Sequence, residues 1–196
     1  MASVPSPRRA RHALLLLALA AVGAILLAVS TGTAGPGPLE LWRELVAGDD
    51  GLARALVTEL RLPRALNAFG AGALLALAGV CMQVLLRNPL ADPYVLGVSG
   101  GDAVGALGAM LLGLGLIAVQ AGAIAGALAA ALLVFALAHG PGGWTPTRLL
   151  LTGVVLAAGF GALIALLLSL GDPTRLRGML FWLMGDLAYA GSPAWL

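Results

Sequence analysis

Long apolar runs separated by short polar segments make up most of the chain. A helix needs about 20 apolar residues to cross the ~30 Å hydrocarbon core of a bilayer. Five runs approach or reach this length, and we expect each to form a membrane span: approximately 13–29, 65–86, 95–116, 117–138 and 149–170. The pattern predicts an all-α fold, a polytopic transmembrane helix bundle in which residues 1–196 form one domain.

The third and fourth runs are continuous, and Asp102 is their only charged residue. A single helix over 95–138 would be ~66 Å long at 1.5 Å per residue, about twice the thickness of the hydrocarbon core. The chain must therefore reverse within this stretch. Glycines favour turns, so we predict the reversal at Gly113-Leu114-Gly115.

The arginines suggest an orientation. Arg8, Arg9 and Arg11 lie directly before the first run, and basic residues beside a first span tend to stay in the cytoplasm. We therefore predict a cytoplasmic N-terminus. Alternation then gives the other segments: 30–64 and 171–191 outside, 87–94 and 139–148 inside. Six arginines would lie outside, against the same rule: Arg43, Arg54, Arg61, Arg64, Arg175 and Arg177.

The first run has a second interpretation. Arg8-Arg9, an apolar stretch and the small residues Thr31-Gly32-Thr33-Ala34 together resemble a secretory signal with a cleavage site. The apolar stretch is longer than in a typical signal, and further apolar runs follow it. We therefore favour a retained helix.

Two segments between or after the runs are expected to form surface helices. Residues 30–61 form the longest polar stretch, and apolar residues recur in it at helical spacing, which predicts an amphipathic helix on the outer surface: Leu41, Trp42, Leu45 and Val46. A similar group predicts a second helix, with Trp182 at the level of the lipid headgroups: Met179, Leu180, Trp182, Leu183 and Leu187. Trp195-Leu196 stands where a sixth span could begin, so we expect an incomplete bundle.

The composition excludes several kinds of chemistry. Only 10% of the residues are charged, against roughly 25% in soluble domains. The chain has no lysine, so it has neither the lysine of a P-loop nor an amine for Schiff-base catalysis. Any ATP must therefore be held by another polypeptide. One cysteine, Cys81, and two distant histidines provide no metal-ligand cluster, and we predict no cofactor and no metal site.

Small residues recur at every fourth position in three of the predicted spans. In lipid, helices associate by close packing at such residues. The rows therefore predict tight contacts between helices: Gly97, Gly101, Gly105, Ala109 and Gly113 in the third span, Ala118, Gly122, Gly126 and Ala130 in the fourth, and Gly153, Ala157, Gly161 and Ala165 in the fifth.

Two features could carry chemistry of their own. Gly97-Val98-Ser99-Gly100-Gly101 matches a nucleophile elbow, and Ser99 with His139 as its base could form an intramembrane serine protease. No strand precedes the motif, so we favour glycines that allow helix contact and a Ser99 that helps to cap the third span. Asp102 is the only acid within a predicted span. A structural polar contact near the helix start is favoured there over ion or substrate binding.

Several short motifs follow one another along the chain, and their types and order together resemble those of a known protein family. They are Arg61-Leu62-Pro63-Arg64, Gly79-Val80-Cys81-Met82-Gln83, the turn with Arg87, Asn88, Pro89, Asp92 and Pro93, Leu96-Gly97-Val98-Ser99-Gly100-Gly101, Arg148-Leu149-Leu150-Leu151-Thr152-Gly153, and Phe181-Trp182-Leu183-Met184-Gly185. Over about 60–190 the chain resembles the FecCD/BtuC-like permease subunits of ABC importers for iron–siderophores, heme and vitamin B12.

The resemblance implies a set of partners. Permeases of this family have ten spans and pair with a second permease copy or homologue around a central path in the plasma (inner) membrane. A periplasmic or lipoprotein substrate-binding protein delivers a metal chelate from outside, and separate ATP-binding subunits drive transport from inside. The lipid bilayer is the remaining partner, and no nucleic acid is expected.

The resemblance also implies roles for individual residues. Arg61, and with it Arg64, would meet acidic residues of the binding protein, and a guanidinium suits such a contact with carboxylates. The alternative is a pair of arginines that snorkel at a helix end. Thr145, Pro146 and Thr147 correspond to the cytoplasmic gate of the family, although Pro146 departs from its small hydroxyl residues. Asp102 stands where the family has a small neutral residue.

The chain has about half the family's length and ends before the segment on which the ATPase docks. We therefore expect the N-terminal half of a permease that does not transport alone. Two other functions stay open: a non-transporting membrane remnant or interaction module, and the intramembrane protease.

Overall fold

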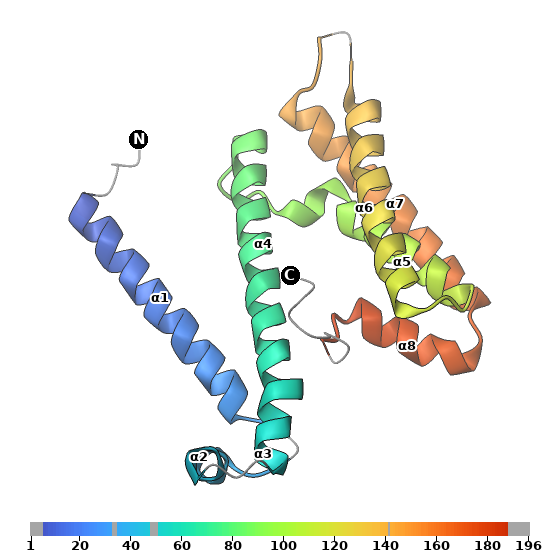
Figure 1. Ribbon diagram of the computed structural model, residues 1–196. Coiled ribbons are helices and arrows are strands. Elements are labelled where there is room, and N and C mark those ends of the chain that lie inside the picture. Colours follow the sequence, from blue (N-terminus) through green and yellow to red (C-terminus); the bar gives the residue numbers. More distant parts are fainter. Residues whose placement is uncertain (1–5, 33–34, 48–50, 141, 188–196) are drawn as a thin grey trace. The chain divides into compact units, whose positions relative to one another are not determined.

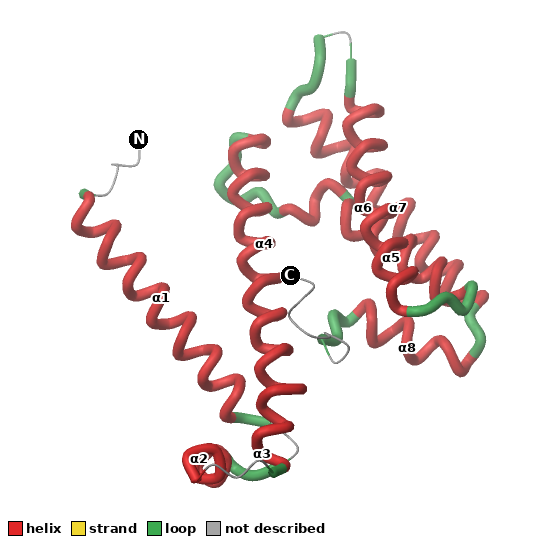
Figure 2. Tube along the Cα trace, in the orientation of Figure 1, coloured by secondary structure: helices red, strands yellow, loops and turns green. Residues whose placement is uncertain are grey.

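The computed structural model describes residues 6–32, 35–47, 51–140 and 142–187. Thr33-Ala34 of the signal-like segment and Trp195-Leu196 therefore lie outside the described residues. Within these ranges the chain is helical, and its only β-type pairing is a bridge between Gly140 and Gly143 (Figures 1 and 2). The helices are α1 Pro7–Ser30, α2 Pro38–Ala47, α3 Leu52–Ala55, the π-helical η1 Leu56–Arg61, α4 Leu62–Leu86, the 3-10 helix η2 Pro93–Leu96, α5 Val98–Leu111, α6 Leu116–Ala138, α7 Pro146–Leu170 and α8 Pro173–Leu183.

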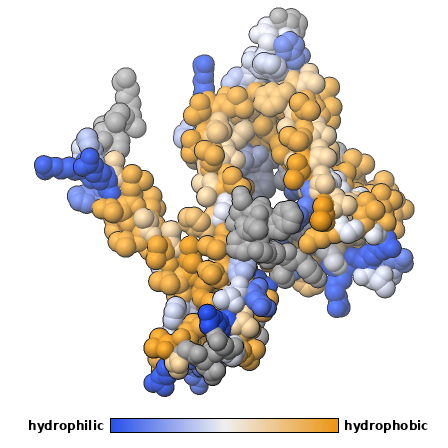
Figure 3. Space-filling view, viewed as in Figure 1, coloured by the Kyte–Doolittle hydropathy of each residue, from blue (hydrophilic) through white to orange (hydrophobic). Residues whose placement is uncertain are grey.

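Among the described residues, four helical stretches are long and apolar enough to cross a membrane: α1, the run Leu52–Leu86, α6 and α7. Their side chains are largely exposed and apolar, as expected for surfaces that face lipid, and polar residues gather at the beginning of α1 (Figure 3). α5 is shorter than these, at 14 residues. The predicted span 95–116 is divided because Gly97 and Gly113 adopt left-handed conformations with φ of +69° and +73°. The reversal between α5 and α6 lies at the predicted glycines.

The contacts divide the chain into two compact units, residues 1–74 with 187–196 and residues 75–186. In the first unit α1 contacts α2 and η1. Leu41 of α2 is fully buried, and the indole Nε1 of Trp42 donates a hydrogen bond to Ser30 Oγ at 2.9 Å. Leu41 and Trp42 of the predicted apolar face therefore contact their own unit, whereas Val46 of the same face is exposed.

In the second unit α5 contacts α6, α7, α8 and η2. α5 and α6 approach so closely that backbone meets backbone. A Cβ atom placed on Gly101 would reach the carbonyl oxygen of Gly126 at 2.5 Å, and one on Gly122 would lie 2.7 Å from the carbonyl oxygen of Gly105. Glycine at these four positions allows the contact, as in other helix pairs that associate in lipid.

Two apolar clusters complete the second unit. One joins η2 to three long helices through Met82, Leu96, Val134, Ala138 and Leu149. The other joins α5 and α6 through Ala106, Ala109, Val119 and Ala123, and Trp182 of α8 packs against it.

α8 is fixed to α5 by more than apolar contact. Met179 is fully buried, and Arg175 Nη1 donates a hydrogen bond to the carbonyl oxygen of Leu111 at 2.6 Å. Leu111 is the last residue of α5, so the guanidinium satisfies a carbonyl that has no partner within its own helix. Positive charge is also favourable at the C-terminal end of a helix dipole.

Candidate functional site

The two arginines expected to meet a binding protein lie in different surroundings. Arg61 ends η1 and is half-buried, and its Nη1 donates to the carbonyl oxygens of Val29 at 3.2 Å and Ser30 at 3.3 Å. These carbonyls belong to the last turn of α1. Arg64 lies in the first turn of α4 and is exposed. Arg64 is therefore accessible to an acidic partner, whereas Arg61 is bound to its own chain.

The chain reverses after α4 in the turn with Arg87, Asn88, Pro89, Asp92 and Pro93, which we call the motif turn. Local hydrogen bonds hold this turn. Arg87 takes a left-handed conformation with φ of +51°, and Asn88 Oδ1 accepts from the backbone N–H of Leu90 at 3.0 Å. Asp92 Oδ1 accepts from the N–H of Tyr94 at 2.7 Å, and Pro93 begins η2. Asn and Asp suit these places because their short side chains bind backbone N–H groups two residues further on.

The gate candidates form the start of α7. Thr145 is its N-cap and accepts from the backbone N–H of Arg148 at 3.3 Å through its hydroxyl. Pro146 is the first helical residue, where its fixed φ suits the helix and its missing N–H costs nothing. This position explains physically why a proline is tolerated at the start of α7.

The structure brings the motif turn and the gate candidates together. Pro146 and Thr147 line a pocket of about 190 Å³ with six residues around the turn and on α7: Leu86, Asn88, Leu90, Ala91, Val95 and Leu150. The two groups are more than 50 positions apart in the sequence, and nothing in the sequence indicated that they would lie side by side. The pocket belongs wholly to the second unit, and η2 is positioned next to it by α7.

Glycines allow η2 and the start of α5 to lie close against α7. A Cβ on Gly153 of α7 would meet the carbonyl oxygen of Val95, and would lie 2.9 Å from the Cα of Leu96. A Cβ on Gly97 would lie 3.2 Å from the backbone nitrogen of Ala157. Among the described residues, nothing lies within 4 Å of a Cβ built on Gly161, so that glycine takes no part in the contact.

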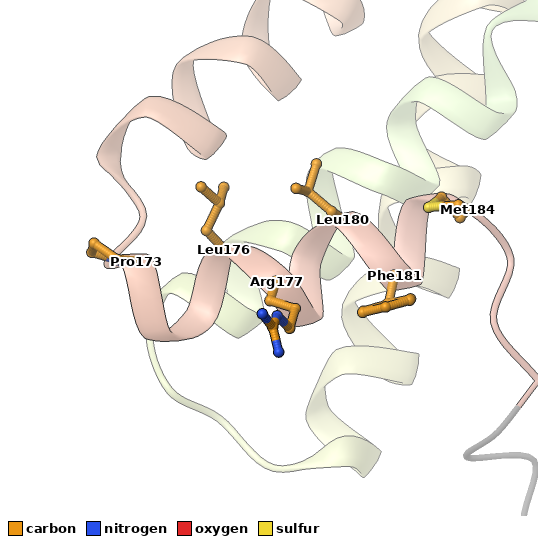
Figure 4. Close-up of a pocket in the computed structure, with 6 residues that line it drawn as sticks. All are labelled: Pro173, Leu176, Arg177, Leu180, Phe181 and Met184. Atoms are coloured by element: carbon orange, nitrogen blue, oxygen red, sulfur yellow. The ribbon is translucent and has the colours of Figure 1, made fainter.

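A second pocket, of about 360 Å³, lies along α8 (Figure 4). Its lining is apolar apart from one guanidinium: Pro173, Leu176, Arg177, Leu180, Phe181 and Met184. Arg177 and Phe181 extend to the same side of the helix. These residues include no His, Cys, Asp or Glu, and therefore no acid–base pair.

The residues considered for hydrolytic chemistry are not assembled. In the part of the chain that the structure describes, no hydrogen bond joins Ser99 to His139, and the His139 ring instead packs edge-on against Trp144 at a centroid distance of 5.1 Å. The expected cap by Ser99 is wrong: Gly97 precedes α5, and no side chain caps that end. Asp102 is half-buried without a hydrogen bond or ion pair to any described residue. The described residues also contain no group of three possible metal ligands.

Trp144 has a role that the sequence did not suggest. Its Nε1 donates to the carbonyl oxygen of Phe135 at 2.8 Å, and its ring packs edge-on against the Phe135 ring at 6.0 Å. The indole thus binds the last turns of α6 to the segment that leads into α7. The sequence does contain a signal for this role, because the tryptophan stands between two glycines and the residue that caps the next helix.

We expect Trp144→Phe to loosen the connection between α6 and α7. The variant keeps a ring but loses the donor, and one hydrogen bond contributes about 0.5–1.5 kcal/mol. Because Trp144 is 57% exposed, the effect should lie at the lower end. Amide hydrogen exchange over 136–145 should quicken, while exchange in α5 stays at the parent rate. Unchanged exchange over 136–145 would show that the indole contact does not hold this end of α6.

Comparison with known proteins places these features in a family. The profile of the FecCD transport family matches residues 15–196. The vitamin B12 import system permease protein BtuC of Vibrio cholerae is 42% identical over 152 residues, covering 76% of this chain and 46% of that protein. BtuC of Serratia proteamaculans is 39% identical over 181 residues, covering 91% of this chain and 51% of that protein.

A solved structure is similar as well. It is an inward-facing conformation of an ABC transporter described as of metal-chelate type, with a TM-score of 0.76 and 30% sequence identity. The match covers 92% of this chain and 55% of that one. The chain thus spans about half the length of the curated relatives it matches.

Proposed function

The chain belongs to the FecCD transport family, and we propose on that premise that it forms part of the permease of an ABC importer that carries a metal chelate across the plasma membrane. The family match over residues 15–196 carries the proposal. The apolar helices support it, since they are long enough to cross the bilayer. The permease is not an enzyme in this proposal, and a separate ATPase provides the energy.

The proposed cargo is a chelate of the cobalamin, heme or iron–siderophore class. Two BtuC relatives named for vitamin B12 favour cobalamin within that class. The proposed partners are a binding protein outside, two ATP-binding subunits inside and a second permease copy or homologue. The N-terminus is cytoplasmic in this arrangement, so Arg64 faces the binding protein, and the pocket between the motif turn and α7 lies near the cytoplasm.

Uptake in cells tests the proposal. In a strain that lacks its other chelate importers, the intact locus should support uptake of at least one of three cargoes: labelled cobalamin, heme or an iron–siderophore. An in-frame deletion within the coding region of this chain should abolish that uptake, as should deletion of the partner ATPase gene. If uptake of all three persists without the chain, the non-transporting remnant is the better account.

Charge reversal at Arg64 tests the docking surface. We expect Arg64→Glu to weaken binding of the substrate-binding protein to the nanodisc-embedded importer by at least about tenfold, because each 1.4 kcal/mol is tenfold and a broken interfacial charge pair costs about 2–5 kcal/mol. Arg43→Glu is the matched control, since Arg43 is an exposed arginine in the same unit. Equal losses in both variants would mean that net charge, not a specific contact, attracts the partner.

A further inference from the structure

The first turns of α5 lie level with the middle of two membrane-spanning helices. A Cβ on Gly101 would lie 2.5 Å from the carbonyl oxygen of Gly126, which is about 15 Å from the first residue of α6 and about 18 Å from its last at 1.5 Å per residue. A Cβ on Gly100 would lie 2.7 Å from the Cβ of Phe160, about 15 Å before the end of α7. Because α6 and α7 are long enough to cross the ~30 Å hydrocarbon core, α5 begins deep within that core.

Asp102 therefore lies far from both membrane surfaces. It follows Gly101 directly, so it shares the depth of the middle of α6. η2 carries the chain inward before α5 begins, since its Leu96 lies against Gly153, about 10 Å inside the start of α7. Long basic side chains at such a depth can extend toward the headgroups. The short side chain of Asp102 cannot, so its carboxylate must be satisfied where it stands.

Ser99 and Asp102 form a polar face on α5. They are three residues apart, so they lie on the same side of the helix. Ser99 is exposed and Asp102 is half-buried, and neither forms a hydrogen bond or ion pair with any described residue. α5 is otherwise an interior helix, with five buried residues: Gly101, Ala103, Ala106, Leu107 and Ala109. The polar face is thus an uncovered part of a helix that its neighbours otherwise enclose.

The arginines of the second unit are placed elsewhere. Arg175 binds a carbonyl at the end of α5, and Arg177 lines the pocket along α8. A Cβ on Gly140 would meet the guanidinium of Arg148, which therefore lies against the segment before α7. Arg87 is exposed in the motif turn. Carboxylates inside a membrane usually pair with a charge or face a polar interior, so Asp102 requires a group that these four arginines do not supply.

We propose that the polar face of α5 packs against a further membrane helix of the complete permease, and that a basic side chain of that helix pairs with Asp102. Two observations favour this occupant. The chain covers only 46% and 51% of two BtuC relatives, so a complete permease has membrane helices in addition to those described. A basic side chain is complementary to the carboxylate, and the Ser99 hydroxyl adds a hydrogen-bonding group to the same contact. The proposal rests on the proposed function, but its test does not measure transport.

Asp102→Asn tests the pair in two settings, the detergent-solubilised chain alone and the permease purified from the intact locus. Asparagine keeps the size and one acceptor but removes the charge. In the chain alone the thermal midpoint should stay at or above the parent value, because an unpaired charge has been removed. In the complete permease it should fall by about 5 °C, because the substitution leaves the basic partner buried without its counter-charge.

Asp172→Asn is the matched control. Asp172 is exposed before α8 and its side chain makes no capping hydrogen bond, so both midpoints should match those of the parent. A midpoint of Asp102→Asn at or above the parent value in the complete permease would overturn the pair. A fall in the chain alone as well would place the partner within this chain, and would overturn it too.

Thiol labelling tests whether a helix or water covers the polar face. In a Cys81→Ala background, Ser99→Cys in the complete permease should react with a charged thiol reagent at least tenfold more slowly than Thr174→Cys, an exposed position of α8. Equal rates would show a water-filled space and overturn the helix contact, as would oxidation that joins two Ser99→Cys chains. Normal uptake by the parent importer with any of these contrary results refutes this contact and leaves the proposed function standing.

Discussion

Gly105→Val should prevent α5 from packing against α6. A Cβ at this position would meet the backbone carbonyl of Gly122 and would lie 3.3 Å from the Cα of Gly126. The obstacle is backbone, which cannot move aside as a flexible side chain can. Overpacking usually costs about 1–3 kcal/mol, and we expect a value at or above the upper end, with a fall of about 5–10 °C in the thermal midpoint of the detergent-solubilised chain.

Gly108→Val is the matched control for this prediction. Gly108 lies one turn further along α5, and nothing lies within 4 Å of a Cβ built there among the described residues. The two variants add the same side chain to the same helix, so differences in helix propensity and hydrophobicity cancel. Equal thermal midpoints for the two variants would mean that the close approach of α5 and α6 contributes nothing to stability.

Gly153→Val should displace η2 from α7. The new side chain would meet the carbonyl of Val95 and the backbone of Leu96, which is buried in the cluster with Met82 and Leu149. Moving η2 also moves the motif turn that precedes it, and Arg87 in that turn is exposed. We expect trypsin to cleave after Arg87 at least several times faster, and chelate uptake through the intact importer to fall to background.

Gly159→Val separates this effect from a general disturbance of α7. Gly159 lies in the same helix, and a Cβ there meets nothing within 4 Å among the described residues. Its tryptic cleavage after Arg87 should match that of the parent chain. Parent-like cleavage in Gly153→Val as well would show that the motif turn holds its shape without the contact between η2 and α7.

Hydropathy and local turn chemistry predicted much of this fold. Apolar runs marked α1, α4, α6 and α7, and Gly113 marked the reversal between α5 and α6, because both signals are local in sequence. The division of 95–116 into η2 and α5 was not predicted, because an apolar composition does not reveal which single glycine adopts a left-handed conformation. The small-residue rows indicated close helix contact but could not distinguish Gly105 from Gly161.

Contacts between distant positions could not be predicted. The sequence showed six arginines on the predicted outer side, against the usual charge distribution, and gave no reason for them. Arg61 and Arg175 each bind carbonyls at the C-terminal end of a helix, α1 in one case and α5 in the other. Such pairing depends on which helix ends meet in three dimensions, and the pattern of residues along a single sequence does not indicate which ends meet.

The backbone contact between α5 and α6 also has a consequence for the order of folding. The two helices are joined by four residues, 112–115, and closing so short a connection costs little chain entropy. Their contact surface is complete within residues 98–138, so the pair can form before α7 is present. We therefore expect this helical hairpin to be the nucleus of the second unit, with α7 and α8 added to a surface that already exists.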